Sequence, residues 1–284
     1  MSKQWVFSGD RISHEFLQAL EPLLGQPNSV RLGKWAVYQA NNLEELAMIK
    51  PIAQQYQLDL APTDSNQSLA DFKLLAMDMD STLISIECVD EIADYCGKKA
   101  EVSAITEATM RGEISDFNES LRRRVALLAG LPVSALEQVY TNRLRLNPGA
   151  ATLVEAAHNA GLKTLLVSGG FSFFTDRMQS QLKLSYTRSN TLEIIDNKLT
   201  GKLLGTIVNA QIKRETVQSI SNELNINTDQ VIAMGDGAND LEMMSIVGIS
   251  VAYHAKPAVA AKASHIIEFG GLDTVLHWFE DARR

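Results

Sequence analysis

The sequence predicts an α/β protein: a doubly wound parallel sheet with a helical segment inserted into it, preceded by a small α+β unit. Residues 1–70 alternate short apolar runs with two amphipathic stretches. From Leu74 onward, short apolar runs are instead separated by longer stretches of helical pattern. A long charged segment of helical pattern interrupts this second region at about residues 87–146. Strands that alternate with helices are typical of βαβ units, whose parallel strands are buried on both faces.

The first 70 residues have the element order βαββαβ. Two helices are expected at 14–24 and 43–56, between the strand-like runs WVFSG, SVRL, WAVYQA and LDLAP. This is the order of a ferredoxin-like unit, which carries its helices on one face of an antiparallel sheet. The polar stretch TDSNQ at residues 63–67 predicts a linker, because its side chains cap and turn but do not pack. We therefore expect domains at 1–70 and 71–284.

The second domain should contain the parallel sheet and a cap formed by the insertion. Gly130 and Pro132 predict a break between helices within that insertion. The segment LEIIDNKLTGKLLG predicts a hairpin that turns at residues 196–198. Strands of the sheet are expected at residues 74–77, 164–167, 231–234, 249–252 and 265–267.

Composition excludes several classes of function. The net charge of −8 argues against nucleic acid and anionic membranes as partners, because phosphate groups attract clustered Lys and Arg. No apolar run approaches the roughly 18 residues of a membrane span. The polar start MSKQWVFSGDRISHEF lacks the apolar core of a secretory signal, and the two cysteines have no metal-site or redox spacing. We expect a cytoplasmic protein that acts on a small molecule.

Polar motifs follow three of the predicted strands. They are DMDST at 78–82, SGG at 168–170 and GDGAND at 235–240, and Lys213 lies between the last two at a predicted helix start. Ligands bind beyond the carboxyl ends of strands in open parallel sheets, so these segments should converge on one crevice. Taken singly, each motif is more often a turn or a helix cap than a site. Their common placement after buried strands favours function.

The crevice should require a cation. Asp78 and Asp80 lie two residues apart, on the same side of an extended chain. Two unit charges about 4 Å apart repel by roughly 4 kcal/mol at an effective dielectric constant near 20. Hard oxygen ligands without nearby His or Cys favour Mg²⁺.

The motifs DMDST, SGG, a lysine and GDGAND, in this order, resemble the haloacid dehalogenase superfamily of phosphohydrolases. The similarity narrows to the phosphoserine phosphatase family through Glu87, MRGEISDFNESLRRRV at 110–125, SGGF, KLTG, GDGANDLEMM and AKP. It extends from Leu74 to the C-terminus. The first 70 residues lie outside it, although ACT-like amino-acid-binding modules share their predicted element order.

The resemblance implies an aspartyl-phosphate mechanism with Mg²⁺ as cofactor and phosphoserine as substrate. Asp78 is then the nucleophile, and Asp80 is the general acid and base. The metal would be held by the side chains of Asp78 and Asp236 and by the backbone carbonyl of Asp80. Asp240 would orient either metal-bound water or Lys213, and Thr82 would either hold the loop by a hydrogen bond or cap a helix. The phosphate group would be bound by Ser168, Gly169, Lys213 and Asn239.

Substrate selection is expected from the inserted segment, because the chemistry of the crevice suits any phosphate monoester. Glu87 suits the ammonium group of phosphoserine, and an arginine suits its carboxylate. Helical geometry lets one or two of the arginines at 122–124 face inward, and the family pattern selects Arg124. Met110 and Phe117 would form either an apolar wall or ordinary packing within the cap.

Two other functions and one assembly state stay open at this level. Phosphotransfer from the aspartyl-phosphate to an alcohol such as homoserine would use the same residues. An amino-acid-sensing binding protein with an inactive phosphatase-like domain would lack a hallmark residue, and none is missing. A homodimer is compatible with the sequence.

Overall fold

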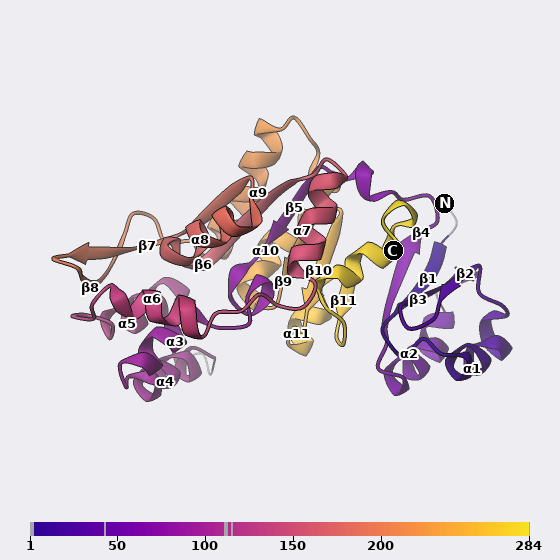
Figure 1. Ribbon diagram of the computed structural model, residues 1–284, viewed down its shortest axis with the longest axis horizontal. Coiled ribbons are helices and arrows are strands. Elements are labelled where there is room, and N and C mark those ends of the chain that lie inside the picture. The colour runs from indigo at the N-terminus through magenta and orange to yellow at the C-terminus, as the bar shows by residue number, and fades with distance from the viewer. Residues whose placement is uncertain (1–2, 43, 111–112, 115, 284) are drawn as a thin grey trace.

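The computed structural model describes residues 3–42, 44–110, 113–114 and 116–283, and the side chain of Met110 is outside this description. The molecule contains a four-stranded sheet, at the right of Figure 1, and a seven-stranded sheet that runs from the centre to the left. Within the described ranges, every helix is too short or too polar to cross a bilayer. The α/β class with a separate small N-terminal sheet is confirmed.

The N-terminal sheet has the predicted βαββαβ order, with antiparallel strands arranged β2-β3-β1-β4. The prediction of a linker at residues 63–67 is partly wrong. β4 continues through Asp64, and Thr63 is buried in it. The second helix begins at Glu45, and its expected start at Leu43 lies outside the described residues. The elements are β1 (Lys3–Ser8), α1 (His14–Leu24), β2 (Ser29–Arg31), β3 (Trp35–Ala40), α2 (Glu45–Gln55) and β4 (Asp59–Asp64).

Both faces of the N-terminal sheet are covered. Trp5 and Phe7 of β1 pack with Phe16 of α1 in a core of their own. Val6 points to the opposite face, as strand alternation requires, and belongs to the core of the large domain. The division near residue 70 therefore crosses a packed interface, and the two domains proposed from the sequence share apolar contacts.

Polar contacts join the two domains beside these apolar ones. The buried Asp59 carboxylate of β4 accepts hydrogen bonds from the backbone N–H groups of residues 268, 269 and 270, at 2.7, 3.0 and 2.8 Å. His265 Nε2 lies 3.0 Å from the carbonyl oxygen of Pro62, and its ring is 4.6 Å from that of Trp278. These contacts place neutral imidazoles and a carboxylate in the interface.

His265 and His277, two histidines at the interface, should lower the free energy of unfolding in acid, because both are neutral in the folded protein. Burial lowers the pKa of His265 and of His277 to about 4. An unfolded histidine has a pKa of about 6.5, so between these values the unfolded chain binds more protons and its stability declines as pH falls. We expect each histidine to contribute a slope of about 1 kcal/mol per pH unit below pH 6.

Urea unfolding between pH 4 and 8 tests this expectation. His265→Gln should remove the contribution of His265, which is about 1 kcal/mol per pH unit below pH 6, from the measured slope. His14→Gln, at an exposed helix start, is the matched control and should leave the slope unchanged. An equal slope in wild type and His265→Gln would contradict the assignment.

The large sheet has the strand order β11-β10-β9-β5-β6-β7-β8. All neighbouring strands are parallel except β8, which is antiparallel to β7. The predicted hairpin is confirmed and extends this sheet at one edge. The strands are β5 (Leu74–Met77), β6 (Lys163–Phe171), β7 (Tyr186–Ile195), β8 (Lys198–Leu204), β9 (Val231–Gly235), β10 (Ile249–Tyr253) and β11 (His265–Ile267).

Helices cover both faces of this sheet, as the doubly wound prediction requires. Leu75 and Met77 of β5 pack with α7 and α8 on one side, and Leu74 and Ala76 pack with α9 and α10 on the other. The α-helices are α7 (Ala150–Asn159), α8 (Ser172–Leu182), α9 (Ala210–Glu223), α10 (Leu241–Met244) and α11 (Pro257–Ala260). Short 3-10 turns are η1 (Leu69–Asp71), η3 (Thr228–Gln230), η4 (Ala238–Asp240), η5 (Leu272–Trp278) and η6 (Glu280–Ala282).

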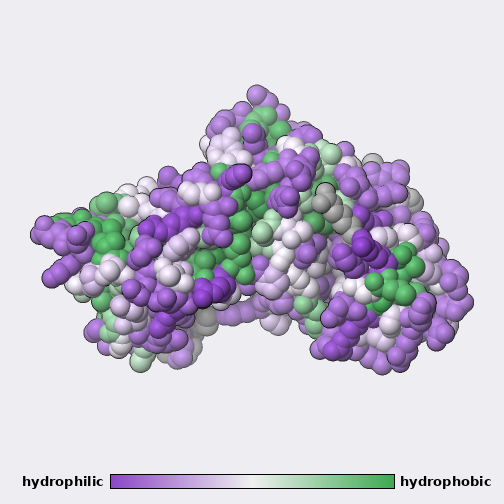
Figure 2. Space-filling model, in the orientation of Figure 1, coloured by the Kyte–Doolittle hydropathy of each residue, from purple (hydrophilic) through white to green (hydrophobic). Residues whose placement is uncertain are grey.

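The insertion forms a helical cap beside the hairpin of β7 and β8 (Figure 1). Its helices are α3 (Cys88–Tyr95), α4 (Lys99–Met110), α5 (Phe117–Ala126) and α6 (Ser134–Asn142), with the predicted break at Gly130 and Pro132. Backbone hydrogen bonds of 2.8 Å join Gly130 and Leu131 to Leu199 of β8. The visible surface is mainly hydrophilic, with apolar side chains gathered at the outer end of the hairpin, where Ile194, Ile195 and Leu204 are exposed (Figure 2).

Candidate active site

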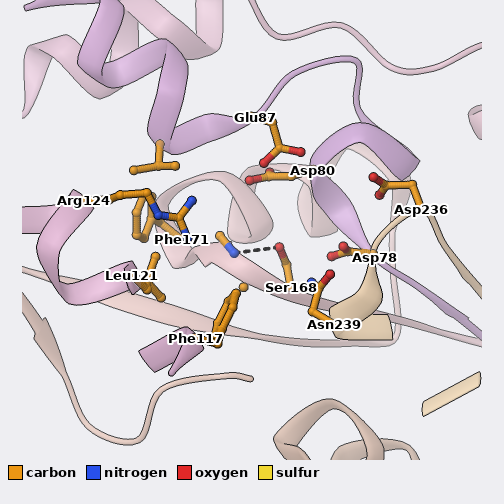
Figure 3. A pocket seen from close by; sticks show the side chains of 13 residues that line it. Asp78, Asp80, Glu87, Phe117, Leu121, Arg124, Ser168, Phe171, Asp236 and Asn239 are labelled. Atoms are coloured by element: carbon orange, nitrogen blue, oxygen red, sulfur yellow. Dashed lines mark hydrogen bonds between the residues drawn. The ribbon is translucent and has the colours of Figure 1, made fainter. Parts of the chain in front are cut away.

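The three polar motifs meet at the carboxyl edge of the large sheet, as predicted. There they form a pocket of about 140 Å³ between the sheet and the cap (Figure 3). Such a volume suits a small molecule. Its lining consists of Asp78, Asp80, Glu87, Val89, Phe117, Leu121, Arg124, Ser168, Gly169, Gly170, Phe171, Asp236 and Asn239.

Asp78 is held rigidly at the end of β5. One of its oxygens, Oδ1, accepts a hydrogen bond of 2.7 Å from the backbone N–H of Met79 and lies 2.8 Å from Lys213 Nζ. The residue is 4% exposed. No described residue donates a hydrogen bond to its other oxygen, Oδ2. The carboxylate is thus fixed through one oxygen, which leaves the second for chemistry.

Asp80 lies on the tight turn that follows β5. Ser81 has φ 56°, and this left-handed residue bends residues 79–83 so that both aspartates line the pocket. Asp80 Oδ2 accepts a hydrogen bond of 3.2 Å from the N–H of Cys88, whereas its buried Oδ1 has no partner among the described residues. Burial, and then the charges of Glu87 and Asp78, hold the pKa of Asp80 well above its usual range. A proton on this carboxyl group is therefore favoured.

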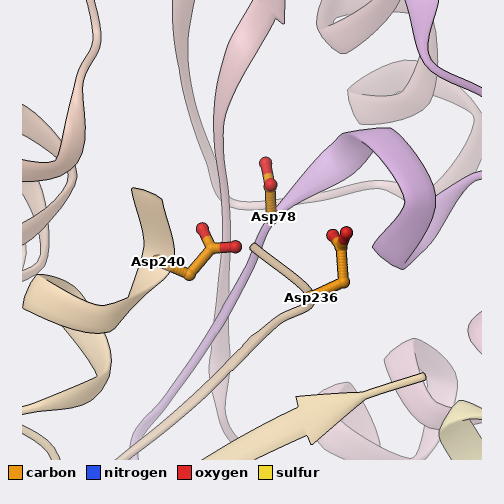
Figure 4. Close-up of side chains that lie close together, drawn as sticks. All are labelled: Asp78, Asp236 and Asp240. Atoms are coloured by element: carbon orange, nitrogen blue, oxygen red, sulfur yellow. The ribbon is translucent and has the colours of Figure 1, made fainter. Parts of the chain in front are cut away.

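Three carboxylates lie together behind the turn. Asp78, Asp236 and Asp240 each offer an oxygen within 4.8 Å of the others (Figure 4). Burial and the charge of Asp78 raise the pKa of Asp236 to about 7, although Lys213 acts against this rise, because three carboxylates share that single ammonium group. A hard divalent cation would supply further positive charge, so the oxygen donors fit Mg²⁺. The side chain of Asp80 is not part of this cluster, and the metal contact through its backbone carbonyl stays a prediction.

Lys213 and Asp240 lie behind Asp78, on the side away from the pocket. Asn209 caps α9 by accepting a hydrogen bond of 3.0 Å from the N–H of Ile212, and this starts the helix one turn before Lys213. Lys213 Nζ is fully buried, 2.7 Å from Asp240 Oδ1 and 2.8 Å from Asp78 Oδ1. Burial alone would lower the pKa of Lys213, but the charges of Asp240 and Asp78 outweigh burial and raise it. The ammonium group therefore stays charged.

Asp240 and Thr82 each make the contact that belongs to one of the two roles left open for them. Asp240 contacts Lys213 directly, and its other oxygen accepts a hydrogen bond of 3.1 Å from the N–H of Gly237. Thr82 Oγ1 donates a hydrogen bond of 2.9 Å to Asp236 Oδ1 and thereby ties the turn to β9. Lys213 itself is not on the pocket lining, so it reaches the site through Asp78.

The last part of β6 supplies hydrogen-bond donors: the strand continues four residues beyond its predicted end at 167, so residues 168–170 lie in an irregular part of β6 and not after it. Ser168 Oγ accepts a hydrogen bond of 2.9 Å from the N–H of Gly170 (Figure 3). A Cβ atom on Gly170 would lie 2.8 Å from Met79 Cε and 3.2 Å from Asp80 Oδ2, so a larger residue would require the Met79 side chain to move and would crowd Asp80. Sequence analysis named Ser168 and Gly169 but missed Gly170, although SGG as a whole was the signal.

The cap contributes two charged side chains to the pocket, Glu87 and Arg124. Glu87 lies where the turn enters α3, and its Oε1 accepts a hydrogen bond of 2.7 Å from Ser81 Oγ. Arg124 of α5 points into the pocket, and its buried Nε has no partner among the described residues. Its neighbour Arg123 instead pairs with Glu119 at 2.7 Å in solvent. Phe117 lines the pocket and also packs against the core, so it fits both of the roles considered for it. Val89 and Leu121, which the sequence did not single out, line the pocket as well.

The fold and the carboxylates of this pocket are those of a hydrolase. The haloacid dehalogenase-like hydrolase family matches residues 75–245. The chain belongs to the haloacid dehalogenase-like hydrolases. Its relatives include a phosphoserine phosphatase from Polaromonas sp., 60% identical over 212 residues, which are 73% of this chain and 90% of the relative. A phosphoserine phosphatase from Haemophilus influenzae is 46% identical and covers 78% of this chain and 69% of its own.

Solved structures extend the similarity over the N-terminal domain. A haloacid dehalogenase family hydrolase from Salmonella enterica serovar Typhi has a TM-score of 0.88 and 33% identity, with full coverage of both chains. A probable phosphoserine phosphatase from Vibrio cholerae, in its unliganded form, has a TM-score of 0.84 and 37% identity. It covers 98% of this chain and 87% of its own. The small sheet and the catalytic domain thus recur together.

Proposed function

We propose that this protein is a phosphoserine phosphatase, which hydrolyses O-phospho-L-serine to L-serine and phosphate through an aspartyl-phosphate. One observation carries the proposal: a single pocket holds Asp78 and Asp80, with Glu87 beside Asp80 and Arg124 across the pocket from Asp78 (Figure 3). The first pair suits a phosphate monoester, and the second suits the ammonium and carboxylate groups of an amino acid.

The chemistry follows from the two oxygens of Asp78 and the proton of Asp80. Asp78 Oδ2 forms a bond to phosphorus while the bond from phosphorus to the serine oxygen breaks. Asp80 delivers its proton to that departing oxygen. Asp80, now a carboxylate, removes a proton from water, whose oxygen attacks phosphorus and breaks the bond to Asp78. Phosphate leaves, and both aspartates return to their starting states.

The remaining residues position the phosphoryl group and balance its charge. Asp78, Asp236 and the Asp80 carbonyl are the proposed ligands of Mg²⁺, which when bound would neutralise negative charge on phosphoryl oxygens. Ser168, Gly169 and Asn239 line the pocket around the reacting group and would donate hydrogen bonds to it. Lys213 holds Asp78 in place. We place the activity in the cytoplasm, as the last step of serine biosynthesis.

Phosphate release from L-phosphoserine, phosphothreonine and glucose 6-phosphate tests the proposal, with Mg²⁺ or with chelator. Release from phosphoserine alone, lost on chelation, is the expected result. Equal release from all three would contradict the selectivity assigned to the cap, and no release would contradict the enzyme. Added homoserine should yield no phosphohomoserine, because the second step uses water.

Replacement of Arg124 by Lys should raise KM for phosphoserine by at least about tenfold, since an ammonium group cannot hold a carboxylate with two parallel hydrogen bonds. Hydrolysis of p-nitrophenyl phosphate, which has no carboxylate, should change by less than about threefold. Arg123→Lys is the matched control, because Arg123 pairs with Glu119 outside the pocket. A similar loss on both substrates would show that Arg124 supports the cap fold and not substrate selection.

A further inference from the structure

Asn190 of β7 is buried next to residues 168–170, the proposed phosphate-binding loop, but does not line the pocket. Its Nδ2 donates a hydrogen bond of 2.8 Å to the carbonyl oxygen of Gly169, and its Oδ1 accepts one of 2.9 Å from the N–H of Val208. The residue is 2% exposed. Asn190 takes no part in the mechanistic steps above. Burying an amide is costly unless it is hydrogen-bonded, and here both ends have a partner, so the amide fixes the two backbone groups that it joins.

A register shift in the sheet explains why this amide is needed. Val167 of β6 pairs with Arg188 of β7, but the next pair is Phe171 with Asn190. Two extra residues of β6 therefore bulge out of the ladder, which carries Ser168, Gly169 and Gly170 toward the pocket. The bulge deprives Gly169 of a backbone partner on β7, and the side chain of Asn190 takes that partner's place.

The amide can be oriented in only one way. Val208 offers a donor and Gly169 an acceptor, so exchanging the oxygen and nitrogen of Asn190 would place like groups together on both sides. In a trans peptide the C=O of Gly169 and the N–H of Gly170 point in opposite directions. With the carbonyl held toward Asn190, the N–H of Gly170 faces Ser168 Oγ, 2.9 Å away.

That last hydrogen bond sets the direction of the Ser168 hydroxyl proton. A serine hydroxyl has one hydrogen to donate, and here its oxygen already accepts from Gly170. Its own hydrogen is then available to the phosphoryl group in the pocket. We infer that Asn190 is a positioning residue, which orients the Gly169–Gly170 peptide and through it the donors of the phosphate-binding loop. The inference rests on the proposed phosphatase function but concerns phosphate binding alone.

Two substitutions and a matched control test the role. Asn190→Leu removes both hydrogen bonds at similar volume, and Asn190→Asp keeps the acceptor for Val208 while facing Gly169 with an oxygen. Ser189→Ala is the control: the neighbouring Ser189 hydroxyl lies 2.8 Å from Thr175 Oγ1, so its loss removes a partly buried hydrogen bond of the same strand that does not involve residues 168–170. Calorimetry with inorganic phosphate and Mg²⁺ measures affinity independently of turnover.

Both Asn190 variants should bind phosphate at least about tenfold more weakly than wild type and Ser189→Ala, with KM raised as well as kcat lowered. The amide resonance of Gly170 should shift on phosphate addition in wild type and less in Asn190→Asp. A purely structural role would lower the melting temperature but leave phosphate affinity within about twofold, which would overturn the inference. If Asn190→Leu does not fold, Asn190→Asp decides. Wild type that binds phosphate but ignores phosphoserine would refute the proposed substrate and leave this role standing.

Discussion

An Asp78→Asn variant should lose at least about 10⁴-fold of its phosphoserine turnover, as expected when a covalent nucleophile is removed. An amide oxygen cannot form the acyl phosphate, and no other carboxylate can replace it: Asp80 carries the proton, and Asp240 is engaged by Lys213 at 2.7 Å. The rate of phosphate release under saturating phosphoserine and Mg²⁺ measures the loss.

The same variant should stay folded. Asn can accept the hydrogen bonds that Met79 and Lys213 now give to Asp78 Oδ1, and its neutral amide relieves repulsion with Asp236 and Asp240. We therefore expect an equal or higher melting temperature in chelator, together with a smaller stabilisation by Mg²⁺. Asp196→Asn, at the exposed turn of the β7–β8 hairpin, should change neither activity nor stability. Residual turnover above about 1% would show that another group attacks phosphorus.

Lys213→Met should both inactivate and destabilise the protein. The lysine is fully buried between Asp78 and Asp240, and its removal leaves two buried carboxylates without their cation. Breaking such a buried pair costs about 3–5 kcal/mol, which for a chain of this size lowers the melting temperature by about 10 °C. Turnover should fall by at least about 10²-fold, because Asp78 loses the contact that holds its Oδ1.

A second substitution separates charge from packing. Adding Asp240→Asn to Lys213→Met removes one of the two uncompensated carboxylates, so stability should partly return while activity stays low. Lys163→Met, on an exposed position of β6, serves as the control for loss of a lysine and should match wild type. If the double variant is no more stable than Lys213→Met, the loss comes from packing and not from unpaired charge.

The sequence determined the fold class and the catalytic motifs because both depend on local patterns. Apolar runs of four or five residues separated by amphipathic stretches require strands and helices in alternation, so β5, β9 and β11 were placed within a residue of their ends. Polar motifs directly after such runs must meet at the carboxyl edge of a parallel sheet. For that reason Asp78, Asp80, Ser168, Asp236 and Asn239 were all identified before the fold was known.

Only the tertiary structure decided how residues distant in sequence act on one another. Nothing local to Lys213 shows that its ammonium group lies behind Asp78 and outside the pocket, and nothing in TDSNQ shows that Thr63 is buried. The choice of Arg124 came from family resemblance, and its orientation depends on how α5 packs against β8. Asn190 carries no motif: its importance arises from a register shift between β6 and β7. Strand pairing, packing and buried hydrogen bonds are long-range properties, and a single sequence records them only indirectly.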